Sequence, residues 1–341
     1  MIKYNGVLIA VSDMENSRRF YRDVLGLKVI EDFGANVTLE GGIFLQTLDT
    51  WKAFIQTDRV VLPNHAGELY FEEEDIEGFC GRLASLDVRY VHPLFEHRWG
   101  QRVVRFYDPD GHVIEVGERL DAVVRRFYEG GLSVAETAAR MDVPLGMVLS
   151  TLGDGALRLV KANMGDFIRV RDAYLDIIDH SPNLKQYARW EYGKHPTDEA
   201  LKEFITAGNL YLLMDGTDIA GVAAITPGQG EDYRQVQWHV DAQDHEVMTL
   251  HLFGILPRYQ GAGVGRTMMR KALDMAAEGG MKAFRLDTRA SNIPAQRFYE
   301  SLGFVFCGKQ HWYAENTGWM DFCLYERAIG EGQQKDRMSV V

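Results

Sequence analysis

Cysteine is scarce in this chain of 341 residues, and the three that occur, Cys80, Cys307 and Cys323, stand far apart. Their number is odd, and no metal or redox motif such as Cys-x-x-Cys is present. A disulfide framework or a cysteine metal site is therefore not expected. Buried, reduced thiols are the simplest interpretation, and they fit a reducing cytoplasm.

Long apolar runs are also missing. None approaches the ~20 residues that a helix needs to cross a bilayer. The segment from Met1 to Ser17 lacks the apolar region and cleavage site of a signal peptide. The sequence therefore predicts a cytoplasmic protein with no membrane partner.

Positive charge is in deficit, since the formal net charge is −12 at pH 7. Nucleic-acid binding needs a surplus of Lys and Arg on one face, so this charge argues against it. Residues 131–153 resemble a helix-turn-helix, but the second helix, Leu145 to Leu152, has no Lys, Arg, Asn or Gln to contact phosphates or bases. We predict a helical extension here and no nucleic-acid partner.

The length of the chain favours about two domains, and the first part carries an internal repeat. A strand at Val7–Val11 and a helix at Met14–Leu25 precede three strands, and the same βαβββ order starts again at Gly67. We expect the two modules to pair their sheets edge to edge around a shared cavity. The remaining predicted elements are the strands Leu27–Ile30, Asn36–Leu39, Ile43–Leu48, Val88–Val91, Gln101–Tyr107 and Val113–Val116, and a helix at Asp75–Leu86.

A joint at Gly153-Asp154-Gly155 separates this part from a second pattern that mixes helices with strands. The strand Leu157–Lys161 is followed by two helices, a hairpin of Leu210–Met214 and Ile219–Thr226 around Asp215-Gly216, and a strand at Gln235–Val240, and further strands and helices continue to Glu326. The predicted fold class is α+β, with a mostly antiparallel sheet in the second domain. The predicted domains are 1–118, a helical extension at 119–153, and 154–330.

A glycine-rich loop carries the strongest chemical signal. The segment Gln260 to Arg266 follows a strand and opens a helix, and its glycines allow the backbone to pass close to a ligand. The helix N-terminus adds unsatisfied N–H donors and partial positive charge, so the loop predicts a pyrophosphate site. Arg258 and Arg266 would add charge. No Gly-Lys-Ser/Thr ends the loop and no acidic residue follows at the spacing of a dinucleotide site.

A second motif, Asp287 to Phe304, follows in the right order. Together the two motifs strongly resemble the GCN5-related N-acetyltransferase (GNAT) family. The resemblance implies an enzyme that uses acetyl-CoA, in which Tyr299 protonates the departing thiolate and a backbone N–H of the strand before the loop stabilises the oxyanion. It implies cofactor contacts from Phe253, Ile255, Gln260, Gly261, Ala262, Gly263, Val264, Gly265, Arg266, Asn292 and Phe298. Asn292 is also a candidate helix N-cap.

The general base is left open by the sequence. His251 lies on the strand that leads to the loop and would titrate near neutral pH; Glu246, Asp241 and His239 are alternatives. The acceptor pocket of the family lies between the first helices of the domain, near Tyr187 to Pro196. The aromatic candidates for its walls are Trp190, Tyr192, Trp238 and Trp312.

Residues 2–118 resemble the vicinal-oxygen-chelate superfamily, which includes glyoxalase and bleomycin-resistance proteins. The matching stretches are Val11–Leu27, Trp99–Arg102 and Phe106–Glu115. Family enzymes bind a divalent metal through side chains on facing strands. The corresponding positions here are Gly6, which has no side chain to offer, and Gln46, Glu68 and Glu115, which would suit a hard cation.

Three interpretations of this domain stay open: a metal-free ligand-binding module, a metal-dependent lyase, isomerase or dioxygenase, and a structural module that forms a homodimer. The prediction for the whole chain is an N-acetyltransferase that transfers acetyl directly to a small-molecule amine and is fused to a ligand-binding domain. The rival prediction is a non-catalytic binding or sensor protein that merely holds CoA.

Overall fold

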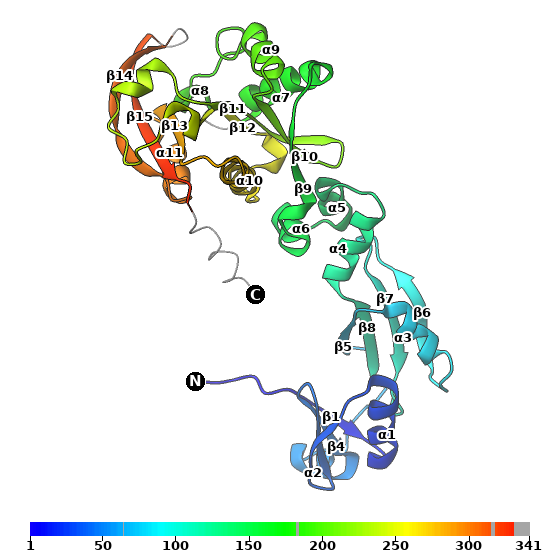
Figure 1. The fold of residues 1–341 in the computed structure, drawn as a ribbon. Coiled ribbons are helices and arrows are strands. Elements are labelled where there is room, and N and C mark those ends of the chain that lie inside the picture. Colours follow the sequence, from blue (N-terminus) through cyan, green and yellow to red (C-terminus); the bar gives the residue numbers. More distant parts are fainter. Residues whose placement is uncertain (64, 182–183, 315–317, 331–341) are drawn as a thin grey trace. The chain divides into compact units, whose positions relative to one another are not determined.

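The structure is a computed structural model that describes residues 1–63, 65–181, 184–314 and 318–330 (Figure 1). The chain divides into two compact units. The first contains residues 1–127 and 140–142, and the second contains residues 128–139 and those from 143 onward. In the described part of the chain, no helix is long and apolar enough to cross a bilayer.

The first unit repeats one βαβββ module, as the sequence predicts. The strand orders β1-β4-β3-β2 and β5-β8-β7-β6 match each other, and the first and last strands of each module pair in parallel. The elements are β1 (Val7–Val11), α1 (Met14–Leu25), β2 (Val29–Asp32), β3 (Asn36–Leu39), β4 (Ile43–Thr47), α2 (Leu48–Ile55), β5 (Glu68–Glu73), α3 (Ile76–Leu83), β6 (Tyr90–Glu96), β7 (Arg102–Tyr107) and β8 (Val113–Glu118). Helix α2 was not predicted, because its run continues the apolar pattern of β4.

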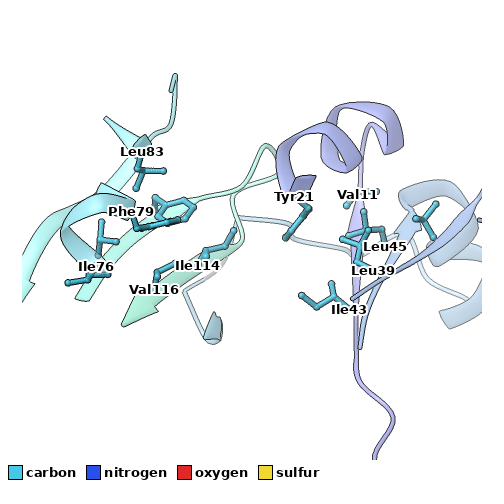
Figure 2. Close-up of a cluster of buried hydrophobic side chains, with 13 residues drawn as sticks. Val11, Tyr21, Leu39, Ile43, Leu45, Ile76, Phe79, Leu83, Ile114 and Val116 are labelled. Atoms are coloured by element: carbon cyan, nitrogen blue, oxygen red, sulfur yellow. The ribbon is translucent and has the colours of Figure 1, made fainter. Parts of the chain in front are cut away.

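The two modules share a core, but not an edge. The predicted edge-to-edge pairing is wrong for the described residues, where each module keeps a separate four-stranded sheet. Apolar side chains of α1, β3 and β4 instead join those of α3, β7 and β8 in one buried cluster (Figure 2). Tyr21 of α1 is fully buried there, and its hydroxyl donates a 2.9 Å hydrogen bond to Asp108 of the second module. Side-chain packing therefore replaces strand pairing between the repeats.

Three helices follow: α4 (Leu120–Glu129), α5 (Val134–Met141) and α6 (Leu145–Leu152). The buried carboxylate of Asp215 accepts hydrogen bonds from the N–H groups of Val134 and Ala135, at 2.7 and 2.9 Å. It also accepts one from the Tyr259 hydroxyl. An acidic group at a helix N-terminus satisfies donors that have no intrahelical acceptor. The start of α5 is thereby fixed to the second unit.

The second unit is built on a seven-stranded sheet of order β14-β15-β13-β12-β11-β10-β9. All its strand pairs are antiparallel except β12 with β13, which confirms the predicted α+β class. Its strands are β9 (Leu157–Lys161), β10 (Leu210–Asp215), β11 (Asp218–Pro227), β12 (Val247–Ile255), β13 (Ala283–Arg289), β14 (Val305–Ala314) and β15 (Gly318–Ala328). Its longer helices are α7 (Phe167–His180), α9 (Asp198–Thr206), α10 (Val264–Glu278) and α11 (Ile293–Glu300), and α8 (Leu184–Tyr187) is short.

The strand predicted at Gln235–Val240 is wrong. The chain there forms a 3₁₀ turn, Glu231–Gln235, followed by irregular backbone. Glu326 explains the difference, because its buried carboxylate accepts the N–H groups of His239 and Val240 and forms a 2.8 Å ion pair with Arg285. A side chain thus satisfies backbone groups that would otherwise join a sheet.

Candidate functional site

A cavity of about 670 Å³ in the second unit lies where β12 and β13 separate. Their parallel ladder ends at the pair Leu250–Leu286, although both strands continue. Leu252 has a left-handed backbone (φ 52°), and the buried Tyr174 hydroxyl donates a 2.8 Å hydrogen bond to its carbonyl oxygen. From residue 251 onward β12 stays paired with β11 but has no strand partner on its β13 side among the described residues, and residues 251 to 253 line the cavity. Phe253, one of the predicted cofactor residues, lines the cavity there.

The glycine-rich loop adopts the geometry that an anion needs. Gly261 and Gly263 have φ values of 76° and 86°, a region that disfavours other residues. Helix α10 begins at Val264 without a side-chain cap and without an acidic residue in its first turn. Its first N–H groups therefore have no intrahelical acceptor and point toward the loop. Gln260 braces the loop, because its amide donates to the carbonyl oxygen of Ile255 at 2.8 Å.

The two arginines near the loop are engaged elsewhere. The Arg266 guanidinium donates to the Ser301 hydroxyl at 3.0 Å, at the end of α11, and Arg258 forms a 2.8 Å ion pair with Asp218. Both side chains are half exposed or nearly so. The backbone and the helix N-terminus, rather than these side chains, supply the donors of the loop.

Helix α11 brings the predicted acid into the cavity. Tyr299 is 8% exposed and lines the cavity with Phe298, whose ring stacks on Phe253 at 5.9 Å between centroids. Burial, with a smaller effect of Asp287, raises the pKa of Tyr299, so its phenol stays protonated. Asn292 accepts the N–H of Ala295 as the helix N-cap and also lines the cavity.

Of the candidate bases, His251 alone lines this cavity in the described structure. Its Nε2 lies 3.2 Å from the Thr226 hydroxyl. Burial lowers the pKa of His251, against an opposing effect of Asp287, so the ring is neutral at neutral pH. Glu246 lies in an ion pair with Lys282 at 2.7 Å, and Asp241 and His239 line a separate hollow.

Two further titratable residues of the cavity were missed from the sequence. Asp287, near the end of β13, accepts a 2.5 Å hydrogen bond from the buried Tyr233 hydroxyl. His195 lines the same cavity, and burial lowers the pKa of its ring. The negative charge of Asp287 opposes this lowering for both His195 and His251, which line the same cavity. Asp287 opened the second motif, but only the folded chain reveals these neighbours.

The predicted aromatic residues divide between two places. Trp190 and Trp312 line the cavity, and Trp312 stacks on Tyr233 at 5.7 Å between centroids. Trp238 lines the separate hollow beside Arg285. Tyr192 instead donates a 2.6 Å hydrogen bond to Asp198, at the start of α9.

The residues predicted to hold a metal in the first unit do not form a ligand set. Arg105 forms ion pairs with both Glu68, at 2.8 Å, and the buried Glu115. Gln46 lies in the other sheet, where it makes hydrogen bonds with Asn36 and Thr50. In the described residues, no group of three His, Cys, Asp or Glu side chains could hold a metal ion. The two carboxylates already have a cationic partner from the chain, so the donors present do not fit a metal.

Comparisons with known proteins match the two parts of the chain to two different families. Residues 4–121 match the Glyoxalase-like domain and residues 177–304 match the Acetyltransferase (GNAT) family. The streptothricin acetyltransferase of Streptomyces lavendulae is 30% identical over 44% of this chain and 63% of its own length. The N-alpha-acetyltransferase RimI of Mycobacterium tuberculosis is 36% identical over 20% of this chain and 42% of its own.

The structure of yncA from Salmonella typhimurium with its cofactor acetyl-CoA is also similar, at 16% identity and a TM-score of 0.39, over 52% of this chain and 95% of that one. The chain covers less than two thirds of the length of both the streptothricin acetyltransferase and RimI. The family matches fall on the two regions where the two families' motifs stand. The chain therefore joins a glyoxalase-like domain to an acetyltransferase domain of the GNAT family.

Proposed function

We propose that residues 154–330 catalyse acetyl-CoA-dependent N-acetylation of a small-molecule amine by direct transfer. The observation that carries this proposal is one cavity that unites Tyr299, His251 and Asp287 beside the unpaired edge of β12. A proton donor, a neutral proton acceptor and free backbone donors are the groups that acyl transfer from a thioester to an amine requires.

The chain offers a continuous set of contacts for the cofactor. Backbone N–H groups at the start of α10 would bind its pyrophosphate, and the edge of β12 would pair with its amide-containing arm. Ile255 would lie at the end of that edge, next to the loop. Acetyl-CoA supplies the acetyl group as an activated thioester.

Proton transfer is assigned to the two groups whose protonation states suit it. His251, or Asp287 beside it, accepts the proton that the acceptor ammonium loses before its nitrogen forms the new bond to the acetyl carbon. Tyr299, held protonated by burial, donates its proton to the sulfur as the carbon–sulfur bond breaks. The nitrogen loses two protons in all, the first from the ammonium before attack and the second as the amide forms. One proton equivalent reaches the sulfur through Tyr299 and the other is released to bulk water, and exchange with water restores both side chains.

A small acceptor fits the cavity better than a folded protein does. The space is about 670 Å³ and is walled by aromatic rings, among them Trp190 and Trp312. One relative is named for streptothricin, a small molecule, whereas RimI is named as an N-alpha-acetyltransferase. The volume and the aromatic walls favour the first of these acceptor types.

The test is acetyl-CoA turnover, read by thiol release, over a panel of simple amines, polyamines and aminoglycosides. We expect amine-dependent release that is abolished in Tyr299→Phe. CoA binding without amine-dependent release from any member of the panel would favour the rival function, a binding or sensor protein.

For the first unit we propose a metal-free ligand-binding module. Arg105 neutralises Glu68 and Glu115, so the observation that favours this function is the cation that the chain itself provides. Metal analysis of the purified protein tests it. Stoichiometric Ni, Zn, Mn or Fe would instead support the metal-dependent lyase, isomerase or dioxygenase.

A further inference from the structure

Two buried donors in the acetyltransferase cavity have no hydrogen-bond partner in the described structure. They are the Nε of Arg289, at the end of β13, and the indole Nε1 of Trp312, on β14. Both residues line the cavity. Buried donors without acceptors are rare in folded proteins because each costs free energy. A pair of them in one cavity points to a ligand that carries an acceptor group.

The positive charge of Arg289 favours an anionic acceptor group over a neutral one. The residue is 7% exposed, and among the described residues its side chain donates one hydrogen bond, from Nη1 to the Tyr187 carbonyl oxygen at 3.1 Å. No Asp or Glu of the described chain forms an ion pair with it. Burial, and in second place the nearby charge of Arg189, lower the pKa of Arg289. A guanidinium in such surroundings is stabilised by an anion.

Arg285, on the same strand, shows how this chain treats a buried arginine that serves only the fold. It is 1% exposed, forms a 2.8 Å ion pair with Glu326, and donates further hydrogen bonds to Gln229 and to the Val240 carbonyl oxygen. Arg289 lies four residues further along and has no such set of partners. The difference separates a structural arginine from one that faces a ligand.

The position of Arg289 favours the acceptor, not the phosphates of the cofactor, as the source of the anion. Arg289 and Asp287 alternate on β13, so their Cα atoms lie roughly 7 Å apart. Asp287 is the carboxylate beside His251 and His195. None of the loop residues from Gln260 to Arg266 lines this cavity in the described structure. An anion at Arg289 would therefore sit near the amine and away from the pyrophosphate site.

We propose that Arg289 binds a carboxylate of the acceptor, with the indole of Trp312 as a second donor, so that the substrate class is amines that also carry a carboxylate, namely amino acids. The inference rests on the proposed acetyltransferase function. The ammonium would lie between Asp287 and His251, and the carboxylate would meet the guanidinium two residues further along β13. Arg289 is then a specificity residue and takes no part in proton transfer.

The experiment compares matched acceptors that differ in the carboxylate alone. The probes are L-phenylalanine with L-phenylalaninamide, and 6-aminohexanoate with 1-aminohexane, tested on wild type and on Arg289→Gln by thiol release. We expect wild type to prefer each acid, and Arg289→Gln to lower kcat/KM for the acids by about 10- to 100-fold, the value of one or two charge-assisted hydrogen bonds. The neutral partners and the KM for acetyl-CoA should change less than about 3-fold on the same scale.

The control is Arg189→Gln, which removes the same charge from an exposed neighbour. It should leave the preference for acids within about 3-fold of wild type. An equal loss of acid preference in Arg289→Gln and Arg189→Gln would assign the preference to the overall positive charge near the cavity. An equal loss of kcat/KM for the acids and for their neutral partners in Arg289→Gln would make Arg289 structural. A raised KM for acetyl-CoA in Arg289→Gln would assign the guanidinium to a cofactor phosphate. Each of these results overturns the inference.

A binding measurement keeps the inference separate from catalysis. Calorimetry with the same probes on the full chain saturated with CoA should show tighter binding of each acid than of its neutral partner, and this difference should vanish in Arg289→Gln. Such a result without turnover by wild type would sustain the anion site while the proposed acetyl transfer fails. Equal binding of acid and neutral partner overturns the anion site.

Discussion

The carboxylates at the candidate site of each unit have opposite kinds of partner. In the first unit Glu115 and Glu68 share the Arg105 guanidinium, so the chain neutralises its own charges. In the second unit Asp287 is bound by the neutral Tyr233 hydroxyl and lines an open cavity beside two neutral histidines. A carboxylate without a cationic partner from the chain is available to a cationic ligand. The contrast favours proton-transfer chemistry at Asp287, whereas Glu68 and Glu115 already have a cationic partner from the chain.

The largest loss of activity is expected from Tyr299→Phe, which tests the proton donor of the second unit. The phenol has no hydrogen-bond partner among the described residues, so the variant should keep its fold while turnover falls about 1,000-fold, as expected for loss of a general acid. Steady-state thiol release measures the effect. Tyr325→Phe is the matched control: this neighbouring tyrosine donates to Glu300 outside the cavity. Near-normal turnover in Tyr299→Phe would remove the acid from the mechanism.

The first unit is tested by Arg105→Ala. The substitution leaves Glu115 buried without its cationic partner, which should lower the free energy of unfolding by about 3 kcal/mol. Chemical denaturation followed by circular dichroism measures the loss. Acetyl transfer by the second unit should stay within about 2-fold of wild type, because Arg105 belongs to the first unit and does not line the cavity of the second. Tighter binding of a divalent metal with no loss of stability would show that the arginine masks a functional metal site.

His251→Ala tests the proton acceptor. We expect kcat to fall about 30-fold, less than the roughly 100-fold or more that is usual for loss of a general base, because Asp287 remains in the cavity as a second proton acceptor. Burial lowers the pKa of His251, so activity of wild type should rise with pH below the usual histidine range and level off at neutral pH. The variant should lose that rise. A pH–rate profile identical to wild type would transfer the role to Asp287 or His195.

The sequence predicts the parts of this site that depend on neighbouring residues, but not those that depend on contacts between residues far apart in the chain. Gln260 to Arg266 and the N-cap Asn292 were predictable, because a glycine pattern and a cap depend on neighbouring residues. The roles of Asp287 and Tyr233 were not, since their hydrogen bond joins residues 54 positions apart.

The errors have the same origin. The strand predicted at Gln235–Val240 fails because Glu326, far along the chain, takes its N–H groups. The metal ligands Glu68 and Glu115 looked available because nothing in the local sequence reveals that Arg105, on a neighbouring strand, pairs with both. Hydrogen bonds and ion pairs between side chains on different strands depend on the tertiary structure, so a local pattern of residue types does not predict them.

The smallest predicted effect concerns Arg258. If the glycine-rich loop bound the pyrophosphate through side-chain charge, this arginine would be important. Its ion pair with Asp218 is about half exposed on both sides, so its Coulomb energy is screened by water and salt. Arg258→Ala should therefore raise the KM for acetyl-CoA less than about 2-fold, and should change stability by under ~1 kcal/mol. Steady-state kinetics at low and high salt measure the first quantity, with Gly263→Ala as the contrasting variant, because its positive φ would strain the loop. A KM that rises tenfold in Arg258→Ala at low salt would show that the arginine leaves Asp218 for the cofactor, and the loop would then bind phosphate by side-chain charge as much as by backbone.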